Sequence, residues 1–387
     1  MRIAQDWIRE EATQAVCDAL TAEGAQALFV GGCVRNALMG EPVSDMDIAT
    51  DAHPETVLAL AKKAGIKAIP TGIGHGTVTL VLNGIPHEVT TFRKDVETDG
   101  RRAVVAFADD IADDAARRDF TMNAIYARPD GTVVDPLNGL PDLHSRRLRF
   151  IGDAEARIRE DYLRTLRYFR FHAWYGNQAE GFDPEALAAI ATTLDGLDTL
   201  SRERVGTELV KLLSAPDPAP AAATMRQIGV LSHVLPGADD RALAPLVHLE
   251  GSSTPEATRR LAALGGEDLQ QTLRLSKSMA IRVAQLRDEI GSTQSAAELA
   301  YRHDATCACD VILLRSAVLE MPMPADFEAE VNRGAAAVFP VAAKDLMPDY
   351  IGPALGKRLR TLEKVWISSR FSLSRQALLD IPDEGQA

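Results

Sequence analysis

Apolar and polar positions alternate along the first third of the chain and then follow helical spacing through the rest. Five short apolar or alternating runs are typical of β-strands: residues 27–30, 66–69, 77–82, 85–92 and 132–135. Asn83-Gly84 separates two of these runs, and this dipeptide is a strong signal for a β-hairpin. Three stretches of the same region have helical spacing: residues 1–25, 56–64 and 111–127. The pattern predicts an N-terminal helix within residues 1–26 and an α+β module with a small sheet over residues 27–145.

Helical periods rich in alanine replace the strand signals from Arg146 onward. Proline and glycine interrupt them in three places: residues 215–220, 251–255 and 321–324. We therefore expect three helical modules, over residues 146–215, 216–320 and 321–387. The polar run 94–102 (KDVETDGRR) lies within the α+β module and predicts a mobile loop.

Two aspartates on one predicted strand are the first candidates for chemistry. Strand side chains alternate between faces, so Asp45 and Asp47 point one way while Met46 and Ile48 point into a core. Residues on the same face are about 6.6 Å apart along the backbone, which lets both carboxylates bind one metal cluster. An isolated Asp-x-Asp is more often a solvated strand edge or a turn cap. The residues just upstream shift the balance towards a metal site.

Gly31 and Gly32 follow the preceding strand directly, and Arg35 comes one turn later. Glycines let backbone N–H groups approach phosphates, and an arginine offers a bidentate partner for them. These residues therefore predict a triphosphate site beside the aspartates. Glu88 in the predicted hairpin is a candidate third carboxylate, and the alternative for it is a solvent-facing strand residue.

Residues 157–174 (RIREDYLRTLRYFRFHAW) predict one amphipathic helix with an apolar stripe opposite Glu160, Arg164 and Arg167. Asp161 lies at the flank of the polar side. Cytosine and adenine both present an amino donor beside a ring-nitrogen acceptor, so Asp161 can accept from the amino group while Arg164 donates to the nitrogen. Guanine and uracil have the inverse pattern. The alternative interpretation is a salt-bridged solvent face.

Composition narrows the class of protein. The 387 residues are 46% hydrophobic and 25% charged, which is ordinary for a globular protein, and no run of about 18 apolar residues is present to span a membrane. The N-terminal stretch lacks the build of a signal peptide, and the four cysteines have no zinc-site spacing, so we expect reduced thiols and a cytoplasmic protein. The pair His303-Asp304 has no convincing partner histidines and is interpreted as structural.

A net charge of −13 argues against non-specific coating of nucleic acid, but the basic residues are unevenly spread. Between His144 and His172, eight arginines face four acidic residues; between Tyr350 and Gln376, six basic residues face Glu363 alone. Two basic segments in an acidic protein are typical of an RNA-binding track. For the second segment, a basic helix face without an RNA role is the alternative.

Seven motifs together resemble the bacterial tRNA nucleotidyltransferase and poly(A) polymerase family, the eubacterial and eukaryotic type of CCA-adding enzyme. They are LFVGGCVRNALMG, SDMDIATDA, HGTVTLV, HEVTTFRKD, RRDFTMNAIY, DPLNGLPDL and EDYLRTLRYFRF, in the family's order over residues 27–175. Each motif is weak alone, and the ordered combination is specific. The resemblance implies a polymerase-β-like nucleotidyltransferase head, then an all-α neck (146–215), body (216–320) and tail (321–387) that hold tRNA.

The resemblance also assigns roles to residues. Asp45 and Asp47 match magnesium ligands, and Gly31, Gly32 and Arg35 lie where the family contacts the triphosphate. The roles in nucleotide binding fall to Arg118, Asp119 and Asn123 in the sugar-and-phosphate motif, to the base-templating pair Asp161 and Arg164, and to Arg167 and Arg170 after it. Asn36 departs from the family, which often has aspartate there, and is expected to brace the turn.

The implied activity is template-independent addition of C, C and A to tRNA 3′ ends from CTP and ATP, with Mg²⁺ as the cofactor. Asp45 and Asp47 would hold the metal ions, with Glu88 as an accessory carboxylate. A poly(A) polymerase, or an enzyme that adds only C or only A, has the same head motifs and remains an alternative. A non-catalytic RNA-binding module is the other alternative, which the intact Asp45 and Asp47 pair disfavours.

Overall fold

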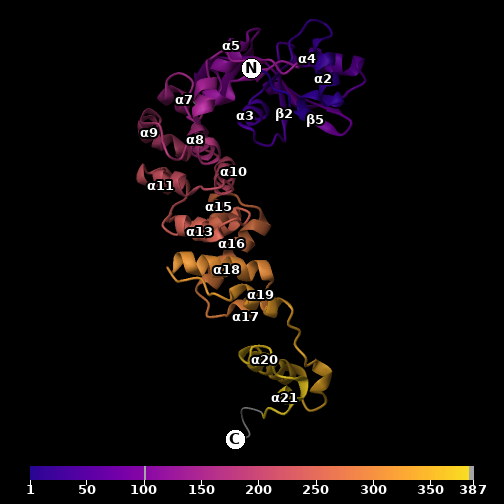
Figure 1. The fold of residues 1–387 in the computed structure, drawn as a ribbon, viewed down its shortest axis with the longest axis vertical. Coiled ribbons are helices and arrows are strands. Elements are labelled where there is room, and N and C mark those ends of the chain that lie inside the picture. Colours follow the sequence, from indigo (N-terminus) through magenta and orange to yellow (C-terminus); the bar gives the residue numbers. More distant parts are fainter. Residues whose placement is uncertain (100–101, 383–387) are drawn as a thin grey trace. The chain divides into compact units, whose positions relative to one another are not determined.

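The computed structural model describes residues 1–99 and 102–382, and the chain forms two compact units (Figure 1). The first unit contains residues 1–236 together with Gln271–Arg274, and the second contains Gly237–Gln270 and the chain from Leu275 onward. The division falls after Pro236, whereas the proline-rich segment 215–220 joins two helices inside the first unit.

A seven-stranded mixed sheet is the centre of the first unit. Its strands are, in spatial order, β3 (Lys67–Gly72), β4 (Thr77–Leu82), β5 (Ile85–Thr91), β2 (Met46–Thr50), β1 (Leu28–Val30), β8 (Tyr126–Ala127) and β9 (Val133–Val134). Only β2 and β5 pair in parallel among these neighbours. The predicted strands and the Asn83-Gly84 hairpin are confirmed, and both turn residues have the positive φ that this hairpin type requires.

Helices pack on the sheet through the apolar sides that the spacing predicts. The helices of this region are α1 (Asp6–Arg9), α2 (Glu11–Thr21), α3 (Gly32–Met39), α4 (Pro54–Lys63), α5 (Ile111–Ala116) and α6 (Leu140–Ser145), with 3₁₀ turns η1 (Ile73–His75) and η2 (Thr121–Asn123). Successive residues of β1 face opposite ways: Phe29 meets Trp7 edge to face, and Val30 joins a cluster with Phe92 and Tyr126. Both faces of the sheet centre are therefore buried.

The predicted loop over residues 94–102 is wrong for the part that the structure describes. Two strands, β6 (Arg93–Asp99) and β7 (Arg102–Phe107), form a separate antiparallel ribbon, and Gly100 and Arg101 lie outside the described residues. The Ala108 N–H closes the ribbon by donating to the Phe92 carbonyl at 2.8 Å. Valine and threonine alternate with charged residues in the first of these strands, and such a sequence suits a β-strand.

The predicted helix over residues 111–127 is also wrong beyond Ala116. Helix α5 ends at Ala116, Phe120 forms a bridge with Phe150, and the segment returns to the sheet as β8. Phe120 is fully buried between Phe150 and Phe171, with ring centroids 5.0 and 5.4 Å away. Burial of this ring against a distant part of the chain overrides the local helical spacing.

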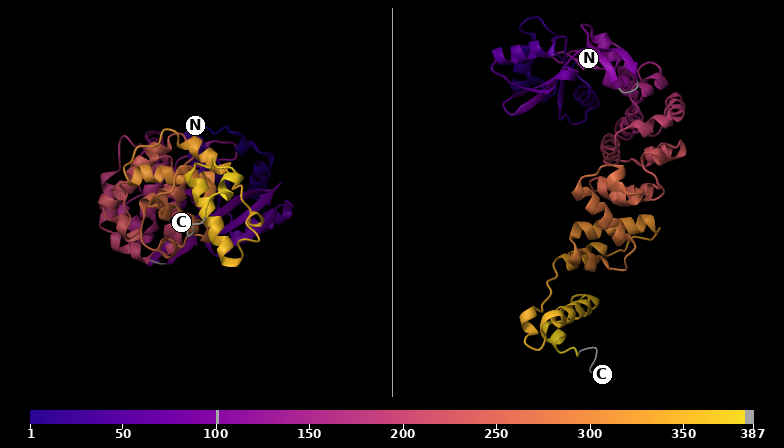
Figure 2. Two further views of the ribbon diagram at one scale, coloured as in Figure 1. Left: turned by 90° about the horizontal axis from the view of Figure 1, so that it is seen from below. Right: turned by 180° about the vertical axis from the view of Figure 1, so that it is seen from behind.

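Helices follow one another through the rest of the first unit (Figures 1 and 2). They are α7 (Ala154–Glu160), α8 (Leu163–Tyr175), α9 (Pro184–Ala191), η3 (Leu194–Thr199), α10 (Arg202–Leu213), α11 (Ala219–Gln227) and α12 (Val230–Val234). The single helix predicted over 157–174 is wrong, because Asp161 has extended backbone angles (φ −153°, ψ 103°). Its side chain accepts from the Leu163 N–H at 3.1 Å, so Asp161 ends α7 and binds the first backbone N–H of α8.

The second unit is helical. Its helices are α13 (Leu243–Glu250), α14 (Ala257–Leu264), α16 (Lys277–Ile290), α17 (Ala296–Arg302), α18 (Ala305–Val318), α19 (Phe327–Ala335), η4 (Ala343–Asp345), α20 (Gly352–Ser368) and α21 (Arg375–Leu379), while α15 (Leu269–Thr272) spans the chain boundary between the units. Buried Arg259 bridges Glu250 and Asp310 at 2.7 and 2.8 Å, which compensates these charges inside the helical core. His303 pairs with Glu289 at 2.9 Å, in keeping with a structural role.

No helix among the described residues is long and apolar enough to cross a membrane.

Candidate functional site

The turn between β1 and α3 brings backbone N–H groups beside the acidic strand. Gly31 has φ 73° and ψ −124°, a conformation that disfavours residues with a side chain. A Cβ atom built on Gly31 would lie 3.7 Å from the Arg118 guanidinium and 3.9 Å from Asp47 Oδ2. The glycine turn, Arg118 and Asp47 therefore meet at one point. The sequence prediction that this turn and this aspartate belong to one site agrees with that arrangement.

Three carboxylates gather at the adjoining strands. Asp47 in β2 is opposite Glu88 in the parallel strand β5, and Asp45 lies one residue before β2, where it accepts from the Ser44 hydroxyl at 3.0 Å. Ile48 is buried, as the alternation predicts. Burial raises the pKa of Asp47 to about 6, and the neighbouring charges of Glu88 and Asp45 add to this effect. A cation bound here would relieve the repulsion.

The chemistry of this acidic group fits a magnesium ion. Magnesium is usually bound by one or two protein carboxylates together with substrate phosphates. Asp45 and Asp47 offer such carboxylates beside the glycine turn, and no group of three or more His, Cys, Asp or Glu residues in the described chain is placed to hold a metal ion. Two protein carboxylates beside a turn suited to phosphate match this preference of magnesium.

Arg35 is buried next to the turn and has no carboxylate within ion-pair distance among the residues that the structure describes. Its guanidinium donates to the Asn36 and Asn123 side-chain oxygens at 2.8 and 2.7 Å, and its Cζ lies 4.0 Å from the centre of the Tyr175 ring. Burial lowers the pKa of Arg35. Such a desolvated cation is stabilised by a bound anion. Asn36 also donates to the Pro42 carbonyl at 2.8 Å and so ties α3 to the loop that follows it, while a bracing role at the glycine turn stays a prediction.

Two residues that sequence reasoning missed hold Arg118 in place. Buried Asp114 accepts from the Arg118 guanidinium at 2.9 Å and from the Tyr126 hydroxyl at 2.8 Å. Burial alone would raise the pKa of Asp114, but Arg118 and the Tyr126 hydroxyl hold it below its ordinary value. Asp114 precedes Arg118 by four residues, a spacing that joins side chains on one helix and could have identified the pair. Nothing in the local sequence indicates Tyr126.

Asp119 and Asn123 lie away from solvent and bind other side chains. Asp119 accepts from Arg167 at 2.7 Å and from the Asn123 amide at 3.0 Å. Burial would raise the pKa of Asp119, whereas Arg167 and Asn123 lower it below its ordinary value. Contact of Asp119 and Asn123 with a nucleotide therefore stays a prediction, because both side chains already have partners within the protein.

The predicted base-templating pair, Asp161 and Arg164, lies at the junction of α7 and α8, but each residue binds other groups of the protein. Asp161 accepts from Arg204 of α10 at 2.7 Å, while the Arg164 guanidinium contacts Glu160 at 2.5 Å and the Arg117 carbonyl at 3.2 Å. Arg204 is 43 residues from Asp161, so sequence reasoning could not find this partner. Asp161 is half-buried and faces partly into solvent, which leaves its carboxylate accessible to a ligand.

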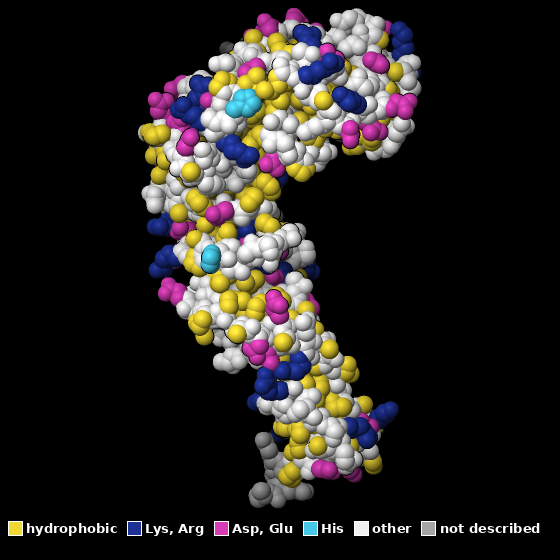
Figure 3. Space-filling view, viewed as in Figure 1, with side chains coloured by type: hydrophobic (Ala, Val, Ile, Leu, Met, Phe, Trp, Pro, Cys, Tyr) yellow, Lys and Arg dark blue, Asp and Glu magenta, His cyan; other side chains and the backbone are white. Residues whose placement is uncertain are grey.

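The excess of arginine between residues 144 and 172 does not leave a bare basic surface. Each of the eight arginines pairs with a carboxylate, in five cases from outside this segment: Arg146–Glu41, Arg147–Asp183, Arg149–Asp142, Arg157–Glu160, Arg159–Glu155, Arg164–Glu160, Arg167–Asp119 and Arg170–Glu208. On the face drawn in Figure 3, basic and acidic side chains are interspersed. The tertiary structure thus neutralises much of the charge that the sequence places together.

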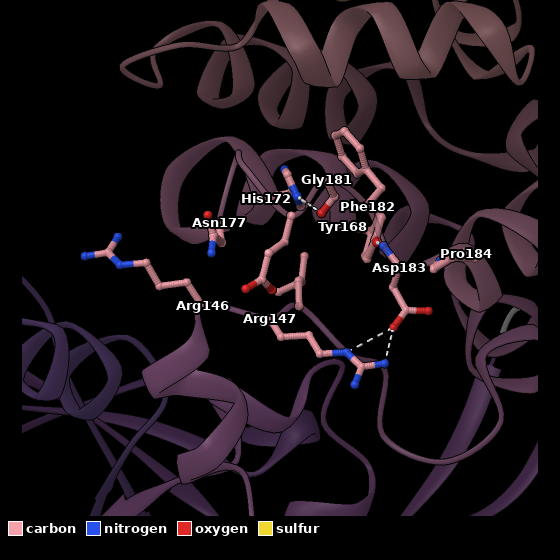
Figure 4. Close-up of a pocket in the computed structure, with 11 residues that line it drawn as sticks. Arg146, Arg147, Tyr168, His172, Asn177, Gly181, Phe182, Asp183 and Pro184 are labelled. Carbon is pink, nitrogen blue, oxygen red and sulfur yellow. Dashed lines mark hydrogen bonds and ion pairs between the residues drawn. The ribbon is translucent and has the colours of Figure 1, made fainter.

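A separate pocket of about 260 Å³ lies between α8 and the segments 146–148 and 177–184 (Figure 4). Arg147 bridges to Asp183 at 2.7 Å, and the His172 ring stacks on Phe182 while its Nε2 atom lies 2.9 Å from the Gly181 carbonyl oxygen. None of the described residues that line this pocket is among the predicted site residues. The pocket is therefore distinct from the acidic group and its glycine turn.

Comparison with known proteins gives two family matches within the first unit and the start of the second. Residues 27–149 match the model described as "Poly A polymerase head domain". Residues 181–241 match the model described as "Probable RNA and SrmB-binding site of polymerase A". The first match begins and ends within a few residues of the α+β module predicted from the hydrophobic pattern.

Whole-chain relatives carry related names. A zebrafish protein (Danio rerio) named CCA tRNA nucleotidyltransferase 1, mitochondrial, is 34% identical over 369 residues, which is 91% of this chain and 85% of the relative. A CCA-adding enzyme of Lacticaseibacillus paracasei is 30% identical over 384 residues and covers 94% of each chain. Among solved structures, the Bacillus stearothermophilus CCA-adding enzyme in complex with CTP has a TM-score of 0.74 at 28% identity, with 93% of both chains covered. The Thermotoga maritima CCA-adding enzyme complexed with tRNA has a TM-score of 0.70 at 16% identity over 98% of both chains, and so shares the fold.

Proposed function

The chain belongs to the family of CCA-adding tRNA nucleotidyltransferases, and on this basis we propose that it adds C, C and A to the 3′ end of tRNA from CTP and ATP. The observation that carries the proposal is the meeting of a glycine turn, an arginine pair and an acidic pair at one end of the sheet. In the proposed reaction the tRNA 3′-hydroxyl attacks the α-phosphate in line, a new ester bond forms, and pyrophosphate leaves. The alternative of a non-catalytic RNA-binding module is not supported by this combination.

Asp45 and Asp47 are the proposed ligands of Mg²⁺. When bound, magnesium would activate the attacking hydroxyl and stabilise the charge that develops on the leaving group. Support comes from the shared neighbourhood of the two carboxylates and from the raised pKa of Asp47, which reflects burial and like-charge repulsion. Glu88 is proposed as an accessory carboxylate, because it lies opposite Asp47 and contributes to that repulsion.

Gly31, Gly32 and Arg35 are proposed to hold the triphosphate, with Arg118 on the other side of the turn. Backbone N–H groups at the start of α3 and two guanidinium groups favour a polyanion there. Arg118 is positioned by Asp114 and Tyr126, whereas Arg35 has no carboxylate partner among the described residues. A bound triphosphate would supply the missing negative charge.

Asp161 and Arg164 are proposed to select the base, with Arg167 and Arg170 behind them on α8. The Asp161 carboxylate can accept from the amino group of cytosine or adenine, and Arg164 can donate to the adjacent ring nitrogen. For this, Arg164 must turn part of its guanidinium from Glu160 towards the base. Uracil and guanine would leave the same two groups unpaired, which costs about 1–3 kcal/mol.

The second unit supplies a candidate contact for the RNA backbone. Lys357, Arg360 and Lys364 lie on one exposed face of α20, and no ion pair of theirs occurs among the described residues. By contrast, Arg370 and Arg375 bind Glu330 and Asp345. The three exposed residues, called the α20 stripe below, are the part of the C-terminal basic segment best suited to contact phosphates.

The direct test uses three tRNA transcripts, one without CCA, one ending after the second C and one complete, each incubated with single nucleoside triphosphates and Mg²⁺. We expect two C residues on the first transcript, one A on the second and nothing on the third. Continued addition of A to the complete transcript would identify a poly(A) polymerase, and failure of either the C or the A step would identify a partial activity. The Asp45→Ala variant, which loses one proposed metal ligand, should add nothing.

Base selection has its own test. Arg164→Ala should lower the preference for CTP over UTP by about tenfold or more, since the donor to the ring nitrogen is lost. The measurement is kcat/KM for each nucleotide with the transcript that lacks CCA. Arg147→Ala is a matched control, because Arg147 pairs with Asp183 in the separate pocket, away from the predicted site residues. An unchanged preference in Arg164→Ala would remove this residue from base selection.

A further inference from the structure

A continuous chain of hydrogen bonds runs from the glycine turn to the helix that carries Arg164. The Arg35 guanidinium donates to Asn123 Oδ1 at 2.7 Å, and Asn123 Nδ2 donates to Asp119 Oδ1 at 3.0 Å. The other oxygen of Asp119 accepts from Arg167 Nε at 2.7 Å. The chain thus joins α3, η2 and α8, three elements that are far apart in the sequence.

The amide of Asn123 is suited to this position because it is both an acceptor and a donor. Its oxygen faces a cation and its NH₂ group faces an anion, so the reversed orientation would place like partial charges together on both sides. The residue is 5% exposed, and solvent therefore cannot substitute for a lost partner at low cost. Neither alanine nor a carboxylate can reproduce both hydrogen bonds.

The two residues at the ends of this hydrogen-bond chain belong to the two proposed binding functions. Arg35 belongs to the proposed triphosphate site, and Arg167 is three residues from Arg164 on α8. Aromatic rings of α8 reinforce the link, since Phe171 and Tyr175 lie 5.0 and 4.0 Å from Arg35 Cζ. The position of Arg35 therefore depends on the position of α8, and the dependence is mutual.

We propose that Asn123 is a positioning residue that couples triphosphate binding to base selection, rather than a residue that contacts the nucleotide. This inference rests on the proposed function of Arg35 and Arg164. With this chain of hydrogen bonds intact, a triphosphate held by Arg35 fixes the position of the bound nucleotide relative to α8. Only a base with the hydrogen-bonding pattern of cytosine or adenine then pairs with Asp161 and Arg164. Coupling of this kind is reciprocal: the correct base also strengthens the binding of its triphosphate.

The test compares CTP with UTP in the wild-type protein and in Asn123→Ala. The ratio of kcat/KM for CTP to that for UTP is expected to fall by about tenfold, a typical size for coupling between two sites. Inorganic triphosphate should compete with CTP comparably in both proteins, because Arg118 and the glycine turn are unchanged. Asn177→Ala is the matched control, since the Asn177 side chain accepts from the Ala179 N–H of its own loop and should leave the ratio unchanged.

A second measurement separates coupling from simple packing. If Asn123 and Arg167 act through one chain of hydrogen bonds, the double variant Asn123→Ala, Arg167→Ala should lower the ratio of kcat/KM for CTP to that for UTP no further than either single change. Asn123→Ser keeps a small polar side chain in the buried position and replaces the alanine variant should that variant fail to fold. A ratio that stays at the wild-type value in a folded variant, with incorporation of CTP and UTP reduced equally, would overturn the proposal.

Failure of the proposed function would be seen separately. A wild-type protein that adds no nucleotide, or that does not discriminate between CTP and UTP, contradicts the function itself. A discriminating wild-type protein with an equally discriminating Asn123→Ala variant contradicts only the coupling.

Discussion

Two features of single residues set the chemistry of the proposed site, and both carry an electrostatic cost. Asp47 is held next to Glu88 by parallel strand pairing, with the Asp45 carboxylate nearby. Arg35 is buried without a carboxylate partner among the described residues. A ligand that brings both a metal ion and a triphosphate compensates both groups at once. The site is therefore built for the ligand and is strained without it.

The strain at Asp47 predicts a pH-dependent gain in stability for Asp47→Asn in the absence of metal. Because folding raises the pKa of Asp47 from its ordinary value near 4 to about 6, the native state binds the proton more tightly than the unfolded state. The charged carboxylate therefore costs stability increasingly as the pH rises from about 4 to about 6, and the cost is constant above that. At pH 8 in EDTA, the free energy of unfolding of the variant should exceed that of wild type by about 1–3 kcal/mol. At pH 4 the two free energies should be equal, because Asp47 is then protonated in wild type.

The measurement is thermal unfolding at the two pH values, together with an incorporation assay, in which the variant should be inactive. Glu88→Gln provides the comparison, since removal of one like charge should reproduce part of the gain in stability while it keeps Asp47. Equal unfolding temperatures of wild type and Asp47→Asn at pH 8 would show that the charge of Asp47 does not destabilise the folded protein.

At the scale of elements, the break between α7 and α8 is the decisive feature. Helix α10 braces α8 at two points, because Arg204 binds Asp161 at its start and Glu208 binds Arg170 further along, at 2.7 and 2.5 Å. Tyr162, the residue after Asp161, packs its ring against Gly196 of η3 so closely that a Cβ there would lie 1.8 Å from a ring carbon. The position of Asp161 thus depends on elements that lie well beyond it in the sequence.

Gly196→Ala is expected to displace the Tyr162 ring and with it the start of α8. Overpacking of this kind costs about 1–3 kcal/mol, and the KM for CTP should rise because the adjacent Asp161 moves. Thermal unfolding and steady-state incorporation measure the two effects. Gly74→Ala is the matched control, because nothing lies within 4 Å of a Cβ at that position. If Gly196→Ala left both quantities at the wild-type values, Tyr162 would have no part in positioning Asp161.

At the scale of the whole molecule, the proposed chemistry and the free basic surface belong to different units. All of the predicted site residues lie in the first unit, where the arginines of the segment 144–172 are paired with carboxylates. The α20 stripe belongs to the second unit. This separation suits a protein that reacts with one end of an RNA and binds its backbone elsewhere.

Reversal of the three charges of the α20 stripe to glutamate should therefore weaken tRNA binding and leave nucleotide binding unchanged. The Kd for tRNA is expected to rise by at least about tenfold at moderate salt, and the dependence of log Kd on log salt should become shallower. Filter binding at several salt concentrations measures both. The double change Lys62→Glu and Lys67→Glu in the first unit is the charge-reversal control. An unchanged salt dependence in the α20 variant would exclude the stripe from RNA binding.

The sequence by itself determined the α+β module, the strand alternation at Asp47 and Ile48, and the glycine turn before Arg35, whereas Asp45 lies just before the strand that was predicted to hold it. These features depend on neighbours within a few residues, through strand period, turn conformation and helix spacing. The order of the motifs also identified the family. The Asn83-Gly84 hairpin is local in the same sense, and it is as predicted.

The tertiary structure decided what local spacing cannot encode. Burial of Phe120 against Phe150 ended the predicted helix at Ala116, and Asp161 divided the second one where α10 and η3 hold it. Ion pairs to distant carboxylates neutralised the arginines that the sequence had grouped. Half of these arginines pair with carboxylates tens of residues away, and only the folded chain brings those opposite charges and the packed rings together. For the same reason, only the fold connects Arg35, Asn123, Asp119 and Arg167 into one chain of hydrogen bonds.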